Sequence, residues 1–388
     1  MNIPDGAWLN PLIGLLEAAQ RAALGLLAWL GLAGDSAGQP AWPWALRLSG
    51  ENLLIDMGQA RRLLWTLALL ALALALLLLA QFWRRRRVWL VLLAPLLVLF
   101  APWPDASVLL VPAHPTSFHR SPTGFSAASI ARGGALYAQH CTACHGADGR
   151  RGERAPTLAV WPPNLAGPLL WRRADGDVLW RILHGTHDRN GQPTMPAFGA
   201  QLAAQDAWAL IDFMKANAAG QSLRATGSWA QPIAVPGMTV RCDGRAPRPV
   251  AAWHGQRLRL VLADAATPAP QEDPRLVTIV VRAAARAPDA PAADCEVNDA
   301  DARSALALIA GADSPANLQL LADRDGWLRA RNAPGQPAWS EDDLVCRTEA
   351  APATTTTAAR APNADGLGAL IARIDGEPVR FVKGGFIH

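Results

Sequence analysis

The sequence predicts a multidomain chain made of an α-helical membrane anchor, an all-α domain and an α/β domain. Three observations support this prediction. Long apolar stretches are concentrated before residue 113, a CxxCH motif follows a helical pattern near residue 140, and strand-like and helix-like segments alternate from about residue 232. With 388 residues, the chain has room for two or three domains.

The charge distribution argues against a nucleic-acid partner. The net charge of +4 comes almost wholly from arginine, because Lys215 and Lys383 are the only lysines. The part of the chain that follows the apolar region has no basic stripe interleaved with aromatic residues, which is the usual pattern for nucleic-acid binding. We therefore expect a lipid bilayer and other proteins as partners, and no nucleic acid.

Residues 1–113 are predicted to form a membrane anchor with about three transmembrane helices. Residues 63–83 are uncharged and apolar, and roughly 20 helical residues cross a bilayer core. Residues 88–104 form a second apolar stretch, which Pro95 is expected to kink. Four arginines separate the two stretches, at residues 84–87, and they predict a helical hairpin with a cytoplasmic turn.

Residues 9–32 allow two interpretations. Glu17, Gln20 and Arg21 interrupt this apolar segment, and a charge at mid-bilayer is strongly destabilising. An amphipathic helix in the membrane interface is therefore one alternative. A third span is favoured, because three crossings return the chain to the outer side of the membrane at about residue 104.

A CxxCH motif, CTACH at residues 141–145, carries the main chemical prediction. In such a motif each thiol adds to one vinyl group of a haem, and the imidazole that follows reaches the iron. Cys141 and Cys144 are thus the predicted attachment residues of one covalently bound haem c. His145 is the predicted proximal ligand of the iron.

Two other readings of the motif fit the surrounding sequence less well. A zinc site needs further soft ligands, and the next cysteine is Cys242, about a hundred residues later. A thioredoxin-type dithiol should follow a strand. Here residues 126–140 are patterned as a helix, with Ser126 as its N-cap.

The segment from Ala128 to Gly220 resembles class I cytochromes c. Gly133 and Tyr137 lie eight and four residues before Cys141, as in that family. The segments CHGADGRRG, WPPNLAG, PTMPAFG and QDAWALIDFMKANAAG match its remaining motifs in order. The resemblance implies an all-α cytochrome c domain at residues 120–220, in which Gly133 permits a close helix crossing.

The resemblance also implies two further site residues. The carbonyl of Pro163 should orient His145, and Met195 should supply the second axial ligand of the iron. His184 and His187 are the alternatives to Met195. A six-coordinate His/Met iron has no open position for substrate, so we expect one-electron transfer and no catalytic residue of its own.

Residues 232–347 are predicted to be an α/β domain. Strand-like segments (RLRLVLADA, RLVTIVVRAA), a helix-like one (DARSALALIAGA), a strand pair (NLQLLADRDGWLRAR) and a capped helix (AWSEDDLVC) follow one another. This order resembles a thioredoxin-like domain that lacks the catalytic CxxC. Cys242, Cys295 and Cys346 leave open a disulfide between two of them.

Two linkers and a terminal hairpin complete the predicted layout. Residues 221–232 are interpreted as a polar linker, and APATTTTAARAPNAD as a low-complexity linker. The segment at residues 348–388 is thus expected to be a linker followed by a hairpin around Asp375-Gly376.

The whole arrangement resembles cytochrome c modules fused to the end of copper-resistance D family membrane proteins. Copper transport through the helices is doubtful, since the membrane region has no histidine and Met57 is its only methionine after the initiator. Haem attachment to CxxCH takes place outside the cytoplasmic membrane in bacteria. We therefore expect a cytochrome of the bacterial inner membrane, with its haem and C-terminal domains in the periplasm. The alternative is a haem subunit of a larger membrane oxidoreductase or oxidase, and redox proteins are the expected partners in both cases.

Overall fold

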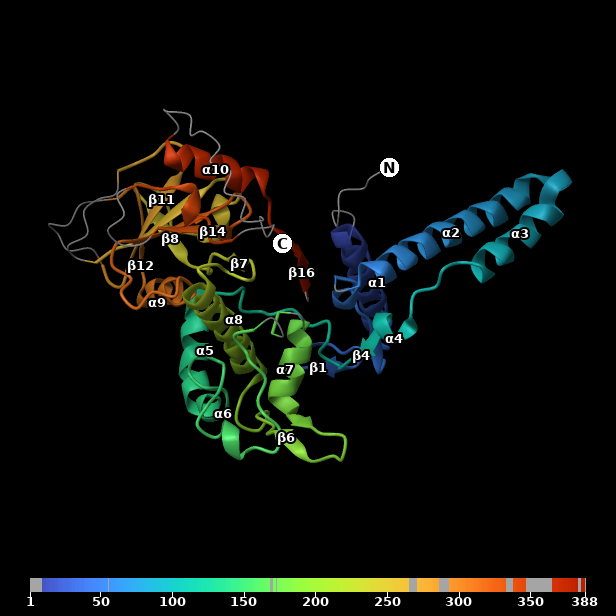
Figure 1. The fold of residues 1–388 in the computed structure, drawn as a ribbon, viewed down its shortest axis with the longest axis horizontal. Helices are drawn as coiled ribbons and strands as arrows, with labels where there is room; N and C mark the ends of the chain where they lie inside the picture. Colours follow the sequence, from blue (N-terminus) through green and yellow to red (C-terminus); the bar gives the residue numbers. More distant parts are fainter. Residues whose placement is uncertain are drawn as a thin grey trace. The chain divides into compact units, whose positions relative to one another are not determined.

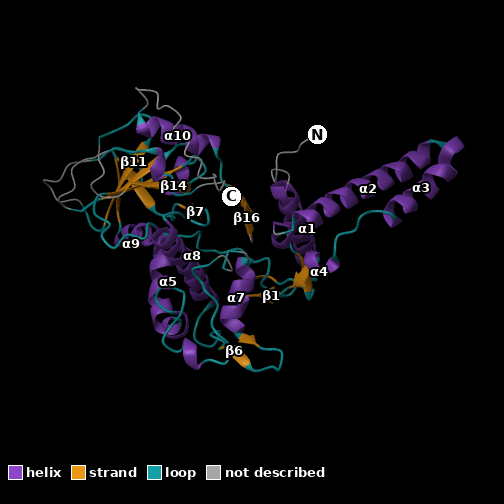
Figure 2. Cartoon of the chain, in the orientation of Figure 1, coloured by secondary structure: helices purple, strands orange, loops and turns teal. Residues whose placement is uncertain are grey.

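The computed structural model divides the chain into two compact units, residues 1–119 with 382–387, and residues 120–381. Figure 1 traces the chain and Figure 2 shows its helices and strands. The residues that the structure describes are 9–54, 56–167, 170–171, 173–264, 271–285, 293–332, 338–346, 365–382 and 385–387.

The first unit combines apolar helices with two short strand pairs. Its helices are α1 (Leu9–Trp29), η1 (Glu51–Leu54), α2 (Met57–Phe82), η2 (Arg84–Arg86), α3 (Arg87–Leu99) and α4 (Ala106–Leu109). Antiparallel pairs are formed by β1 (Asp35–Ser36) with β2 (Gln39–Pro40), and by β3 (Leu46–Leu48) with β4 (Leu110–Pro112). The pairing of β3 with β4 joins residues 33–56 to residues 104–119. We call these two segments together the cap.

Helices α2 and α3 form a hairpin, with the arginine run at its turn (Figure 1). At the other end of the hairpin, the Thr66 hydroxyl donates to the Pro102 carbonyl at 3.0 Å. Among the described residues, Pro11–Trp29 and Met57–Phe82 are the two helices long and apolar enough to cross a membrane, and α3 is shorter. These helices suggest a membrane anchor.

The cap is held together by its own contacts. The buried Trp42 ring packs against Phe118, with ring centroids 4.5 Å apart, and its indole N–H donates to the Leu46 carbonyl at 3.0 Å. Asn52 donates from Nδ2 to the Val108 carbonyl at 2.8 Å, which links the two segments of the cap. The cap is therefore a folded element, because these contacts and the β3–β4 pair join segments that are distant in sequence.

The second unit begins with helices on either side of the CxxCH motif. They are α5 (Ala127–His140), α6 (Thr142–His145), η3 (Ala155–Thr157), α7 (Asp175–His184) and α8 (Ala204–Thr226). A two-stranded ribbon of β5 (Thr186–His187) and β6 (Pro193–Met195) lies between α7 and α8 in the chain. Ser126 caps α5 by accepting a hydrogen bond from the Ser129 N–H, as the sequence predicts.

Helix α8 continues beyond the predicted end of the helical domain. Residues 221–226, which the sequence assigns to a polar linker, form its last turns. The reason is packing: Leu223 is buried, and Arg224 donates to the Gly311 carbonyl and pairs with Asp313. A Cβ added at Gly220 would overlap the carbonyl oxygen of Leu308, which belongs to helix α9 (Ala300–Ile309), so α8 and α9 touch backbone to backbone.

The C-terminal part of the second unit is built on an eight-stranded sheet. Its strands are β7 (Ile233–Ala234), β8 (Thr239–Cys242), β9 (Arg248–Pro249), β10 (Leu258–Leu262), β11 (Val277–Arg282), β12 (Cys295–Asn298), β13 (Leu318–Ala322) and β14 (Trp327–Asn332). Their spatial order is β7-β14-β13-β10-β11-β12-β8-β9. The neighbours β10, β11 and β12 run parallel, whereas β13 runs antiparallel to β10 and β14.

The elements predicted for this part are confirmed individually. The strand-like segments are β10, β11, β13 and β14, and α9 (Ala300–Ile309) is the predicted helix. The predicted capped helix is one turn, η5 (Glu341–Asp343), with a capping box between Ser340 and Asp343. The turn η4 (Val250–Trp253) precedes β10.

The thioredoxin-like arrangement stays a prediction for this part of the chain. Among the described residues between β10 and β11 there is no helix, although that fold places one there. Helix α9 instead follows β12, the third parallel strand.

The predicted hairpin around Asp375-Gly376 is wrong, because these residues end helix α10 (Gly366–Gly376). Its apolar side chains recur at helical spacing and enter the core beside Leu321 and Ala330. Figures 1 and 2 show α9 and α10 on opposite sides of the sheet. Strands β15 (Arg380–Val382) and β16 (Gly385–Ile387) pair after this helix, and most of the predicted low-complexity linker, 351–364, lies outside the described residues.

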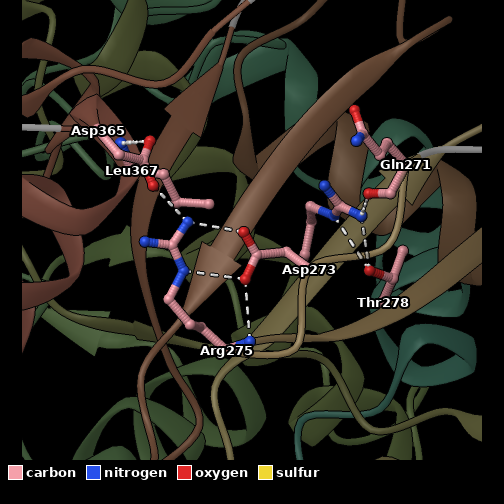
Figure 3. Close-up of polar contacts among 7 residues, drawn as sticks. Gln271, Asp273, Arg275, Thr278, Asp365 and Leu367 are labelled. Atoms are coloured by element: carbon pink, nitrogen blue, oxygen red, sulfur yellow. Dashed lines mark hydrogen bonds and ion pairs between the residues drawn. The ribbon is translucent and has the colours of Figure 1, made fainter. Parts of the chain in front are cut away.

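Charged contacts hold both ends of α10. Figure 3 shows the Arg275 guanidinium between the carboxylates of Asp273 and Asp365, the N-cap of α10. At the other end, the fully buried Arg329 donates to the Glu377 carbonyl at 2.7 Å. Helix α10 is therefore an integral part of the C-terminal domain, which extends past the predicted boundary at residue 347.

Candidate functional site

Helices α5 and α8 meet at Gly133. A Cβ added at Gly133 would overlap the carbonyl oxygen of Ala209 and come within 2.8 Å of the Phe213 Cβ. Glycine therefore lets the helices cross at backbone contact, which confirms the close crossing expected from the sequence. One turn later, the buried Tyr137 packs on Phe213 with ring centroids 5.1 Å apart. Its hydroxyl donates to the Gly146 carbonyl at 2.9 Å, which ties the crossing to the end of the CxxCH motif.

The CxxCH motif forms one helical turn, α6, directly after α5. The N–H groups of Cys144 and His145 donate to the Cys141 carbonyl at 3.2 and 2.9 Å. Residues at i, i+3 and i+4 share one face of such a turn, so both thiols and the imidazole lie on the same side. The following loop folds back on the turn, since the Gly152 N–H donates to the Cys144 carbonyl at 3.0 Å.

Of the two thiols of the motif, that of Cys141 lacks the electrostatics of the attacking cysteine in a redox-active dithiol. Both are free of disulfide bonds and partly buried. Burial raises the pKa of the Cys141 thiol to about 11, and the neighbouring Cys144 adds to this effect. Dithiol oxidoreductases instead lower the pKa of the attacking cysteine.

His145 lies opposite Pro163. Burial lowers the pKa of its imidazole, and the backbone carbonyl of Pro163 partly offsets this effect. The Nδ1 atom of His145 is buried and has no hydrogen-bond partner among the described residues. When Nδ1 of a neutral imidazole carries the proton, Nε2 is its free nitrogen, which is what an axial ligand requires.

Met195 is the last residue of β6, with its side chain partly buried. It pairs in register with Thr186 of β5, and the hydroxyls of Thr186 and Thr194 are 2.8 Å apart. The two alternative ligands differ from it in exposure. His184 and His187 are both exposed, and the His184 ring stacks on Trp180 with centroids 3.5 Å apart.

A ring contact joins the CxxCH segment to the Met195 loop. The imidazole of His140, directly before Cys141, meets the Phe198 ring edge to face at 5.9 Å. Phe198 follows Met195 by three residues, and its N–H donates to the Ile182 carbonyl at 3.0 Å. The structure thus brings the attachment motif beside the loop that carries Met195.

The donor set of this region fits a haem better than a bare metal ion. Within the described ranges, no group of three or more His, Cys, Asp or Glu side chains is arranged to hold a metal ion. The thiols of Cys141 and Cys144 therefore have no further partners of these types for a zinc site. Two free thiols and one imidazole on a single helical face, with the Met195 loop nearby, are the set that a covalent haem uses.

Comparison with known proteins decides the nature of this region. Residues 128–214 match the family model described as cytochrome C oxidase, cbb3-type, subunit III. This segment is a cytochrome c domain. Such a domain implies covalently bound haem c and electron transfer, and cytochrome c domains usually lie outside the cytoplasm. The match covers less than a quarter of the chain, so the family of the whole protein does not follow from it.

One solved structure and the curated proteins complete the comparison. The chain is similar to the KustC0563 c-type cytochrome, with 27% sequence identity, 21% of this chain and 92% of that chain covered, and a TM-score of 0.18. No curated protein matches the chain.

The remaining cysteines lie in the C-terminal domain: Cys242 and Cys295 are on strands of the sheet, and Cys346 follows η5. Cys242 on β8 and Cys295 on β12 face each other in register and form a disulfide, the pairing that the sequence left open. Cys346 is a buried free thiol, and burial raises its pKa to about 11.

The sequence did not indicate one buried polar group, the carboxylate of Asp212. Asp212 of α8 is 4% exposed and accepts hydrogen bonds from the hydroxyls of Thr123 and Ser129, the latter at 2.7 Å. Burial raises its pKa, while the two hydroxyls and Lys215 oppose the shift. The partners lie more than eighty residues away in the chain, so no local pattern indicates the contact.

Proposed function

We propose that this protein is a membrane-anchored c-type cytochrome of the bacterial inner membrane, which carries single electrons in the periplasm. The CxxCH turn supports this proposal most directly, because it presents Cys141, Cys144 and His145 on one face below the α5–α8 crossing. Haem c supplies one-electron transfer between ferric and ferrous iron when it is bound.

Each site residue has a distinct role in this proposal. Cys141 and Cys144 attach one haem through thioether bonds, and His145 offers Nε2 to the iron while Pro163 faces its Nδ1. Met195 offers its thioether sulfur as the second axial ligand. The exposure of His184 and His187, and the stacking of His184 on Trp180, favour Met195 over the two histidines.

The anchoring part of the proposal rests on the α2–α3 hairpin. Trp65 and Trp103 are exposed beside the Thr66–Pro102 hydrogen bond, and Trp83 and Trp89 are exposed beside the arginine turn. Tryptophan is enriched at both interfaces of a bilayer. Trp65 and Trp83 are 18 positions apart, and at about 1.5 Å per residue this spacing is roughly 27 Å, close to the thickness of a bilayer core. With the arginines on the cytoplasmic side, the chain after α3 lies outside.

A second candidate function is a haem subunit of a larger membrane oxidoreductase. The description of the matched family model, an oxidase subunit, favours it. Purification in mild detergent separates the two candidates, since a stably co-purifying catalytic chain supports the second.

Haem staining of cysteine variants on denaturing gels tests the attachment. We expect that Cys141→Ala and Cys144→Ala each reduce covalent haem strongly, because one thioether bond is lost. The matched control is Cys346→Ser, which removes a thiol outside the motif and should leave the staining intact. Unchanged staining in a Cys141→Ala/Cys144→Ala double variant would exclude attachment at this motif.

A further inference from the structure

Helix α1 packs against the base of the α2–α3 hairpin. A single buried core joins the start of α1 to η1 and to the first turns of α2, and its buried members are Leu9, Leu12, Ile13, Leu53, Ala60 and Leu63. Along α2, the described side chains of this core and those packed against it extend no further than Leu67. Trp65, the proposed outer end of the membrane-spanning part, lies at this same level. Helix α1 therefore meets α2 at and outside the bilayer boundary.

The middle of α1 is hydrogen-bonded to the cap. Gln20 is 8% exposed, and its Oε1 accepts from the Leu48 N–H at 2.7 Å. Its Nε2 donates to the Leu48 carbonyl at 3.2 Å and to the Leu16 carbonyl at 3.1 Å. Leu48 belongs to β3, which pairs with β4 in a two-stranded sheet. The centre of α1 and this ribbon are therefore at the same depth.

That shared depth conflicts with a spanning helix. If α1 crossed the bilayer, its central Gln20 would lie near mid-membrane and would carry the β3–β4 ribbon with it. The ribbon is part of the cap, which carries the exposed carboxylates of Asp35, Asp56 and Asp105, and charged side chains on irregular backbone are not tolerated where lipid surrounds them. The ribbon therefore lies outside the hydrocarbon, and the middle of α1 lies there too.

The face of α1 opposite the cap is apolar and exposed. Leu15 and Leu26 are exposed on it, and Trp29 is 80% exposed near its end. Ala18, Ala19, Ala22 and Ala23 continue this face. Glu17 and Arg21 form an ion pair with each other, and such a pair is tolerated at the polar boundary of a bilayer but strongly disfavoured at its centre.

We propose that α1 lies along the outer surface of the bilayer, with its exposed face in the boundary between lipid headgroups and acyl chains. The lipid bilayer is the chosen occupant because the hairpin that α1 packs against enters the bilayer at the level of Trp65 and Trp103. The anchor then has two spans, α2 and α3, and both ends of α1 are on the outer side. This inference rests on the proposed function in one respect, since α2 and α3 must cross a membrane.

Fluorescence quenching at Ala22 tests the depth of α1. Ala22→Cys on the exposed face is labelled with a fluorophore, and the full chain is reconstituted into vesicles with lipids brominated either near the headgroup or at the chain end. We expect a larger loss of fluorescence with bromine near the headgroup, since interfacial helices lie about 5–10 Å into this boundary. Stronger quenching by the chain-end bromine would mean that α1 spans. If neither brominated lipid quenches the fluorescence, protein rather than lipid covers this face. Either outcome overturns the proposal.

Labelling of spheroplasts with a membrane-impermeant maleimide gives an independent test. Pro11→Cys and Gly34→Cys place thiols at the two ends of α1, and a Cβ at Gly34 has no atom within 4 Å. Both should react from outside, whereas a spanning α1 would protect Pro11→Cys until the membrane is permeabilised. Trp83→Cys at the arginine turn is the control for the anchor. It should react only after permeabilisation, and if it reacts from outside, the hairpin does not cross and the proposed anchoring fails instead.

Discussion

Met195 ends strand β6. Its side chain is partly buried, whereas those of His184 and His187 are exposed. Thioether sulfur favours ferrous iron, so Met195→His should keep the iron low-spin while lowering its reduction potential. Met195→Ala should instead open the position to carbon monoxide. Optical spectra and redox titration of the purified variants measure both effects, and His187→Ala is the matched control. A wild-type protein without the far-red sulfur-to-iron band, together with a high-spin His184→Ala or His187→Ala variant, would show bis-histidine ligation.

Asp212 provides a pH-dependent contribution to stability. Because burial raises its pKa above the usual value, the folded chain keeps this proton to a higher pH than the unfolded chain does. Stability therefore falls as pH rises between the two pKa values, by about 1.4 kcal/mol for each pKa unit of separation. Asp212→Asn does not titrate, so its stability should vary less with pH.

Thermal unfolding of the haem-loaded protein from about pH 4 to about pH 7 measures this difference. The wild type should lose stability relative to Asp212→Asn as the pH rises. Lys215 and Asp175 are the charged groups that modulate Asp212, and both remain in the variant. Parallel stability curves would mean that Asp212 has the same pKa in both states.

The role of a residue can be predicted from sequence when the residues that it acts with are close to it in the chain. Cys141, Cys144 and His145 are adjacent in the chain, so their spacing alone indicates haem attachment. The pairing of Cys242 with Cys295 depends on the register of β8 against β12, and two cysteines far apart in sequence do not reveal it. Asp212 was missed for the same reason, since its partners come from residues 123 and 129.

At the scale of elements, the crossing of α5 and α8 depends on a single glycine. Gly133→Ala should push the helices apart and lower the free energy of unfolding by about 1–3 kcal/mol, the usual effect of overpacking. Gly134→Ala is the matched control, because its Cβ would meet only the Phe213 ring edge, at 3.1 Å. Urea unfolding of the haem-loaded full chain measures both variants. Equal destabilisation by both substitutions would refute the backbone contact at Gly133.

The elements that the sequence mispredicts are those whose partners are distant in the chain. The Asp375-Gly376 pair has the composition of a turn, yet Leu367, Leu370, Ile371 and Ile374 bury one helical face against the sheet. Residues 221–226 are polar enough for a linker, but contacts with α9 and with residues 311–313 extend α8 through them. In both cases tertiary packing overrides local composition.

At the scale of the whole molecule, the sequence predicts the kinds of domain better than their limits. The apolar segments, the CxxCH motif and the strand pattern each indicate their region from local periodicity. The attachment of α9 to α8 through Gly220 and Arg224 joins the cytochrome c domain and the C-terminal sheet into one compact unit. Such a junction depends on contacts between distant residues, so it has no signature in the sequence.

A spectroelectrochemical titration of the full-length protein, purified in mild detergent, tests the central claim of electron transfer most directly. We expect one reversible one-electron wave from a low-spin haem that stays attached to the polypeptide after denaturation. The wave should disappear in the Cys141→Ala/Cys144→Ala variant once free haem is washed away. A polypeptide that carries no covalent haem, or a haem without a reversible one-electron wave, would mean that this protein is not an electron-carrying c-type cytochrome.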